Sequence, residues 1–151
     1  MATTTTSISI NSPDLTGDVI AINKVTTLSK AGVSTGLDQT TGVGRKVTTA
    51  NSQYTLITAS EYGDNKAHKL YIRIPSNNVT EYATITIGSQ SVGRLYGGDF
   101  LFMPYDGTAD VKITPSVSTS FAVEHFLIFE VQWPVLKHHS LLVLRTPFPI
   151  L

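Results

Sequence analysis

Apolar side chains recur at every second position in several short segments of this chain, and this spacing constrains the fold more than any other feature of the sequence. Leu70, Ile72 and Ile74 alternate with Tyr71 and Arg73. Similar alternation occurs in residues 54–59, 82–87, 111–114 and 121–131. Successive side chains of a strand point to opposite faces, so each segment predicts a strand with one core-facing side and one wetter side.

Glycine and proline separate these segments at short intervals. Pro75, Gly88 and Pro115 each end one of them. Residues 136–144 fit a short helix as well as a strand. Many short strands with such punctuation indicate a sandwich or barrel, and 151 residues suffice for one domain. We therefore predict an all-β fold, an antiparallel β-sandwich of the jelly-roll or immunoglobulin-like type.

The two ends of the chain differ from its middle. Ile8 and Ile10 alternate with serines, which predicts a short edge strand in an extended N-terminal arm. The sequence thus divides into an arm over residues 1–16, a sandwich over 17–130 and a C-terminal tail over 131–151. The tail has no glycine, no acidic residue and three prolines. A tail of this apolar composition needs a surface to bury against, either on its own domain or on a neighbouring subunit.

Three local patterns lead to further expectations about the middle of the chain. Residues 32–45 contain four glycines and few apolar side chains, which predicts a long loop of the kind that often carries function. Asp106-Gly107 lies between two apolar runs and predicts a hairpin turn. Phe100 to Met103 is apolar at every position, which predicts a strand that is buried on both sides.

Composition argues against several classes of protein. Charged residues make up 15% of the chain, below the roughly 25% of an average globular protein. The 11 basic and 11 acidic side chains give no net charge, which argues against nucleic-acid binding. There is no cysteine, so no disulfide or thiolate metal site forms. Neither a secretion signal nor an apolar run long enough to cross a membrane is visible, so we expect no membrane partner.

Candidate metal and phosphate sites are weak. His138 and His139 are adjacent, and neighbouring side chains of a strand face opposite ways, so they do not easily bind one ion. His125 alternates with large apolar residues and is expected to be a partly buried histidine. Residues 106–110 lack most carboxylates of a calcium loop. The glycines of residues 42–46 are not followed by the helix that a phosphate loop needs.

No catalytic arrangement is apparent either. The chain has no nucleophile elbow, and a pairing of Asp99 with Asp106 or Asp110 is conceivable, but nothing selects these acids over ordinary turn residues. We therefore expect a protein that is not an enzyme, with no cofactor and no metal.

Two segments resemble a known class of proteins. Residues 95–111 read LYGGDFLFMPYDGTADV, and residues 121–130 read FAVEHFLIFE. In these segments the chain is similar to small structural proteins of tailed phages, many of them from marine and cyanobacterial podophages. The resemblance spans residues 47–130 and implies a β-sandwich within a virus particle. The resemblance implies that such a protein stops near Glu130, and we therefore interpret residues 131–151 as an added segment.

From the resemblance and the composition we expect a structural virion protein on the capsid surface. It would decorate or reinforce the capsid by contact with the major capsid protein or other virion proteins, as a homo-oligomer such as a trimer. Its arm and tail would supply the interface residues, which are Ile8, Ile10, Trp133, Leu141, Leu142 and Phe148. The alternative is a carbohydrate- or receptor-binding module of a tail or fibre. It would use the tyrosines or the loop at residues 32–45.

Overall fold

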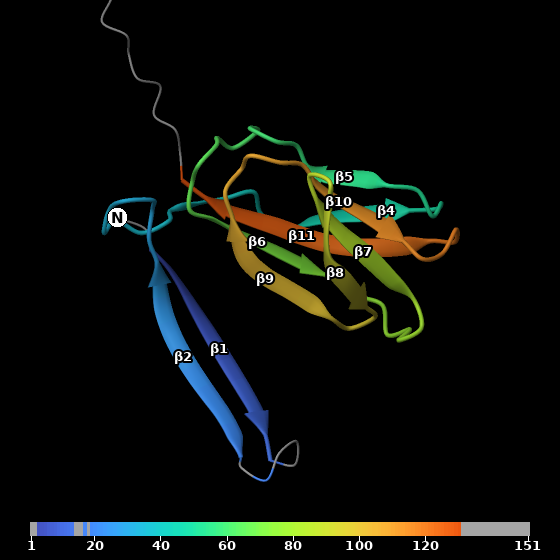
Figure 1. The fold of residues 1–151 in the computed structure, drawn as a ribbon, viewed down its shortest axis with the longest axis horizontal. Helices are drawn as coiled ribbons and strands as arrows, with labels where there is room; N and C mark the ends of the chain where they lie inside the picture. The colour runs from blue at the N-terminus through green and yellow to red at the C-terminus, as the bar shows by residue number, and fades with distance from the viewer. Residues whose placement is uncertain (1–2, 14–16, 18, 131–151) are drawn as a thin grey trace, which may run out of the picture.

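The protein is an all-β antiparallel sandwich with a projecting hairpin, as Figure 1 shows. The computed structural model describes residues 3–13, 17 and 19–130. One sheet has the strand order β5 (Tyr54–Ile57), β10 (Val111–Pro115), β7 (Tyr82–Ile87) and β8 (Gln90–Tyr96). The other has the order β3 (Gln39–Thr40), β11 (Phe121–Phe129), β6 (His68–Arg73) and β9 (Phe100–Tyr105), with β4 (Gly44–Thr48) also paired to β11. The β-sandwich predicted from the alternation is confirmed.

The core lies between these two sheets and contains the apolar residues of the predicted alternation. Leu70 and Ile72 of β6 and Leu127 of β11 point inward and are fully buried. They meet Ile85 of β7 and Ile113 of β10 from the opposite sheet. Removal of this apolar surface from water is the main stabilising contribution to such a domain, at about 25 cal/mol per Å².

A separate two-stranded sheet projects from the sandwich. β1 (Thr4–Ser12) pairs antiparallel with β2 (Ile20–Leu28) along its whole length, from Thr4 opposite Leu28 to Ser12 opposite Ile20. We call this hairpin, residues 4–28, the arm (Figure 1). It extends beyond the boundary at residue 16 that the sequence suggested. The reason is that β2 has no partner other than β1 among the described residues.

The base of the arm is fixed to the sandwich. Leu28 and Leu37 are buried against Ile128 of β11 and form a second, smaller apolar cluster. The Leu37 amide donates a hydrogen bond of 2.8 Å to the Leu28 carbonyl, and the Thr4 hydroxyl donates one of 3.0 Å to the Leu37 carbonyl. The carboxylate of Glu130 accepts a hydrogen bond of 3.3 Å from the Ala31 amide. The arm therefore begins at a well-packed joint.

The structure corrects three expectations. Residues 32–45 are not a continuous loop, because β3 and the start of β4 form within them and pair with β11. The turn at Asp106-Gly107 exists, but it does not close a hairpin, because β9 and β10 belong to different sheets. β9 is not buried on both sides, since Phe100 is 66% exposed.

Candidate protein-interaction surface

One face of the arm carries its isoleucines together with Lys24 and several hydroxyl side chains, and the other face is mainly polar. The register places Ile8 and Ile10 of β1 on the same side as Ile20 and Ile22 of β2. Leu28 belongs to this side and packs on the sandwich, so we call it the inner face of the arm. Ile8 is 46% exposed and Ile10 is 50% exposed. A two-stranded hairpin in water is marginally stable, so exposed isoleucines on it need an explanation.

Aromatic side chains cross the outer face of the β11–β6–β9 sheet. Phe126 lies opposite Tyr71, and Tyr71 lies opposite Phe102, on three adjacent strands. Phe100 extends this row at the end of β9 and is its most exposed member. We call these four residues the aromatic strip. They face away from the core, where solvent-facing positions of a sheet are usually polar.

The rings of the strip stack face to face. The ring centroids of Tyr71 and Phe126 are 4.8 Å apart at an interplanar angle of 20°, and those of Tyr71 and Phe100 are 6.2 Å apart at 24°. The shorter spacing equals the distance between neighbouring strands, about 4.8 Å. Tyr71 therefore has its faces against the flanking rings, and its edge is left for other contacts. Such a surface suits apolar protein contacts better than stacking of a sugar ring, which needs an open ring face.

A groove lies between the arm and the aromatic strip. One wall is β1 from Thr4 to Ile10, and the other consists of the strip together with Ile128. The groove encloses about 700 Å³ and its lining is mostly apolar. Ile128 at its closed end is covered by Leu28 and Leu37, whereas the outer part is open. Both walls thus present apolar surface to the same space.

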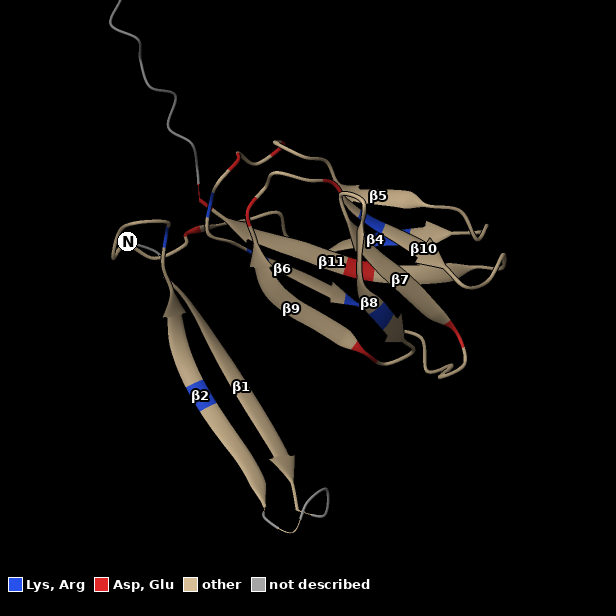
Figure 2. Cartoon of the chain, in the orientation of Figure 1, with Lys and Arg blue, Asp and Glu red and all other residues tan. Residues whose placement is uncertain are grey.

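Charge is sparse on this surface. Within the described part of the arm the only charged residue is Lys24 of β2, which Figure 2 shows as a single blue band. At the border of the strip, Arg73 and Glu124 form an ion pair of 3.8 Å across β6 and β11. That pair is internal to the sheet, whereas Lys24 lies opposite Ile8 in the register and therefore stands on the inner face of the arm among the isoleucines.

Two of the six predicted interface residues lie in the part of the chain that the structure describes. Ile8 and Ile10 lie on the inner face of the arm and line the groove. The predicted positions Trp133, Leu141, Leu142 and Phe148 lie outside the described residues. Sequence reasoning missed the aromatic strip. Its signal in the sequence is the apolar character of both faces of residues 100–103, which equally predicts a strand buried on both sides.

His125 lines a small cavity of about 180 Å³ beside Thr41, Gly44 and Tyr62. Its Nδ1 atom has no hydrogen-bond partner, and burial lowers the pKa of the ring. Gly44 lies against the ring, because a Cβ at this position would be 3.1 Å from it. No carboxylate lines the cavity to orient or activate the His125 ring. In the described part of the chain, no three His, Cys, Asp or Glu side chains gather as a metal site would require.

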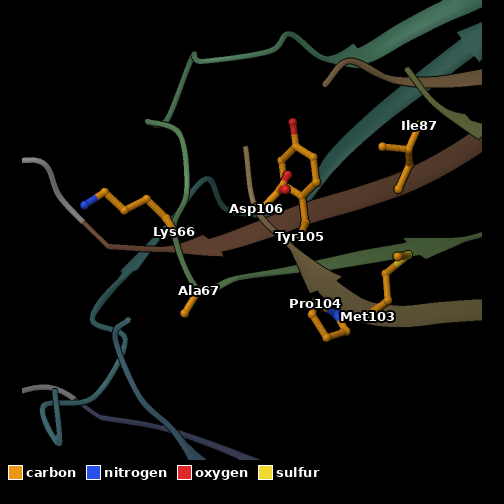
Figure 3. A pocket seen from close by; sticks show the side chains of 7 residues that line it. All are labelled: Lys66, Ala67, Ile87, Met103, Pro104, Tyr105 and Asp106. Carbon is orange, nitrogen blue, oxygen red and sulfur yellow. The ribbon is translucent and has the colours of Figure 1, made fainter. Parts of the chain in front are cut away.

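A pocket of about 320 Å³ opens beside Tyr105 and Asp106 (Figure 3). Its polar groups are already paired within the fold. The Tyr105 hydroxyl donates a hydrogen bond of 2.7 Å to the Ala109 carbonyl, and the Asp106 carboxylate accepts hydrogen bonds from the amide and hydroxyl of Thr108. These two bonds hold the pKa of Asp106 below its usual range, because they favour the ionised carboxylate. They stabilise the turn and leave no converging set of free groups for a ligand.

The tyrosines expected for a sugar-binding module do not form a coplanar row. The rings of Tyr82 and Tyr96 are tilted by 52° with centroids 5.2 Å apart. The guanidinium of Arg94 lies 4.5 Å from the centroid of Tyr82, and the ammonium of Lys46 lies 5.7 Å from that of Tyr54. Cations thus cover ring faces that a sugar would use.

Comparisons with known proteins assign no family. No protein-family model matches the sequence, and no curated protein matches it significantly. Among solved structures, the chain is similar to the mitogen derived from Yersinia pseudotuberculosis, with a TM-score of 0.43 and 15% sequence identity. The alignment covers 73% of this chain and 98% of that one. In the part of the chain that the structure describes, no helix is long and apolar enough to cross a membrane.

Proposed function

We propose that this protein is a non-enzymatic structural component of a virus particle that decorates or reinforces the capsid through protein contacts. The observation that carries the proposal is the arm, a hairpin with exposed isoleucines that projects from a compact sandwich at a packed joint. The aromatic strip beside it adds a second apolar surface.

The physical reason is that such a role needs stable contacts and no chemistry. Buried aliphatic and aromatic side chains supply most of the energy of protein interfaces. A projecting hairpin also has unpaired strand edges, which add strands to a partner or pair with a second hairpin. The resemblance of residues 95–111 and 121–130 to phage structural proteins supports the particle as the setting.

The test is to locate the protein in particles. Particles from the source culture are purified on a density gradient, and the protein is quantified by peptide mass spectrometry relative to the major capsid protein. The proposal expects the protein to band with the particles in a fixed ratio. If it stays in the soluble fraction while the major capsid protein bands, the proposal fails.

The alternative, a carbohydrate- or receptor-binding module of a tail or fibre, has less support from the geometry. It would need ring faces open to a sugar, and the rings of Tyr71 and Tyr82 are covered by neighbouring side chains. A glycan array with the purified protein checks it directly. The side chain of Tyr96 is partly exposed. Specific glycan binding that the substitution Tyr96→Ala abolishes would favour this function instead.

A further inference from the structure

A thin segment runs along one edge of β11. Residues 39–47, which we call the edge strap, comprise β3, the link to β4 and most of β4, and they pair with β11 alone among the described strands. None of their side chains is buried, whereas Leu37 before the strap and Thr48 after it are buried. The strap is therefore held mainly by backbone hydrogen bonds, and a segment with so few buried apolar contacts opens at a low free energy.

The strap is attached to β11 on both sides of a bend. The Thr41 amide donates a hydrogen bond of 3.0 Å to the Leu127 carbonyl, and the Thr41 hydroxyl accepts one of 3.0 Å from the Leu127 amide. Beyond the bend, the Thr48 hydroxyl donates a bond of 3.4 Å to the Phe121 carbonyl. Gly42 has a φ angle of 71°, which glycine adopts without steric cost. The chain can thus pivot at Gly42 while Thr48 holds the far end.

His125 of β11 lies directly behind the strap. It is opposite Gly44 in the register, and because glycine has no side chain, the backbone of the strap rests on the imidazole ring. The Nδ1 atom of the ring is buried and has no hydrogen-bond partner in the described part of the chain. A neutral ring with its proton on Nε2 tolerates this, since a bare Nδ1 needs no acceptor. A protonated ring has a donor at Nδ1 as well, and a buried cationic donor without an acceptor is costly.

The groups around the ring do not offset this cost. The residues that face the ring from the strap, β5 and β6 are uncharged: Thr41, Gly42, Val43, Gly44, Leu56, Ile57 and Ile72. Tyr62 is the one titratable side chain besides His125 that lines the cavity, and burial, helped by Glu61, raises its pKa, so it stays neutral in acid. Glu124, the neighbour of His125 on β11, lies on the opposite face and pairs with Arg73 at 3.8 Å. Lys46 on the strap is itself a cation and repels a charged ring.

We propose that His125 and the edge strap form an acid-sensitive latch, in which protonation of the ring releases the strap from β11. While the ring is neutral, the strap stays paired with β11. Once the ring gains a proton, its Nδ1–H reaches an acceptor only in water, and the strap is the weakest element that separates it from water. Release leaves this edge of β11 unpaired and open to a strand of another chain. The inference is independent of the role in a particle, because the latch operates in the isolated protein.

The direction with pH follows from the two states of the ring. Burial lowers the pKa of His125 in the closed state, whereas in the open state the ring titrates near its ordinary value of 6.5. The open state therefore binds more protons as the pH falls below about 6.5, so closure is strongest above this pH and weakens below it. If the closed ring stays neutral, the equilibrium constant for opening rises by at most about 25-fold between pH 7 and pH 5.

The test measures amide hydrogen exchange of the full chain by NMR at pH 7 and pH 5, as protection relative to an unstructured chain at the same pH. The amides of Thr41 and Leu127 report on the strap, and the amide of Ile85 in β7 reports on the core. Protection at Thr41 and Leu127 should fall by about 10- to 25-fold on acidification, and protection at Ile85 should fall much less. An unchanged protection at Thr41 would overturn the latch, and so would an equal loss at Ile85, because the whole domain would then be opening.

A variant without the titrating ring supplies the control. In His125→Leu the protection at Thr41 should change by less than about twofold between the two pH values, and His125→Gln serves the same purpose with a polar side chain if the leucine variant does not fold. His68 is retained in both variants, so any acid sensitivity that it causes remains in the comparison. The same loss of protection in these variants as in the wild type would show that His125 is not the trigger. In the wild type the ring of His125 should titrate below 6.5, and titration at or above this value would also refute the latch.

Discussion

Replacement of Gly107 by alanine provides a sharp test of the packing at the turn between β9 and β10. The φ angle of Gly107 is 87°, a conformation that costs an L-residue about 1–2 kcal/mol. A Cβ at this position would also collide with the carbonyl oxygen of Gly63, far inside the 3.0 Å limit of real Cβ contacts. The backbone must therefore shift to accept the methyl group.

That shift disturbs two hydrogen bonds. The Gly63 carbonyl accepts a bond of 3.0 Å from Nε2 of the fully buried His68, and the Gly107 carbonyl accepts one of 2.9 Å from the Ser60 amide. A buried polar group that loses its partner costs about 1–3 kcal/mol. Because Nδ1 of His68 has no partner, the ring would then have none at all. Together with the cost of the backbone conformation, Gly107→Ala should destabilise the protein by about 2–5 kcal/mol.

Gly98→Ala is the matched control. Gly98 has a φ angle of 92°, but a Cβ there would meet nothing within 4 Å. It should cost only the backbone conformation, about 1–2 kcal/mol. Urea unfolding of both variants, followed by circular dichroism, gives the two free energies of unfolding. Equal losses would refute the reasoning, because they would show that the contact with Gly63 has no energetic effect.

Three further changes test the rest of the fold. Glu130→Ala should cost about 1–3 kcal/mol in urea unfolding, because the carboxylate, 6% exposed, accepts hydrogen bonds from the amides of Ala31 and Ala67; an unchanged midpoint would contradict this. Phe121→Ala should cost about 3–5 kcal/mol, since Phe121 is among the largest fully buried side chains, and a loss below about 1 kcal/mol would mean that the core there is loosely packed. Burial, helped by the charge of Asp106, raises the pKa of Tyr105 from 10.0 to about 12. The resulting stability is present below pH 10 and is lost as the pH rises from 10 to 12. Tyr105→Phe should lack this part of the alkaline loss, and an identical pH profile would argue against it.

The sequence by itself determined where most strands lie and which residues face the core. In β6 and β11 the alternation assigns Leu70, Ile72 and Leu127 to the buried side, and the structure buries all three. This succeeds because the two-residue period of a strand is a local property of the backbone. The sequence did not predict the strand β8. Leu95 is the one side chain of this strand that is half-buried, and the strand therefore shows little apolar alternation.

The tertiary structure decided which strands pair and which apolar faces stay exposed. Asp106-Gly107 has the residues of a hairpin turn, yet β9 and β10 enter different sheets, because pairing depends on strands distant in the sequence. The candidate site shows the same limit. The alternation of Ile8 and Ile10 marked the arm, but Phe100 and Phe126 became a surface strip only through the pairing of β6, β9 and β11. An apolar residue has the same side chain whether covered or exposed, and only the arrangement of the whole chain determines what lies against it.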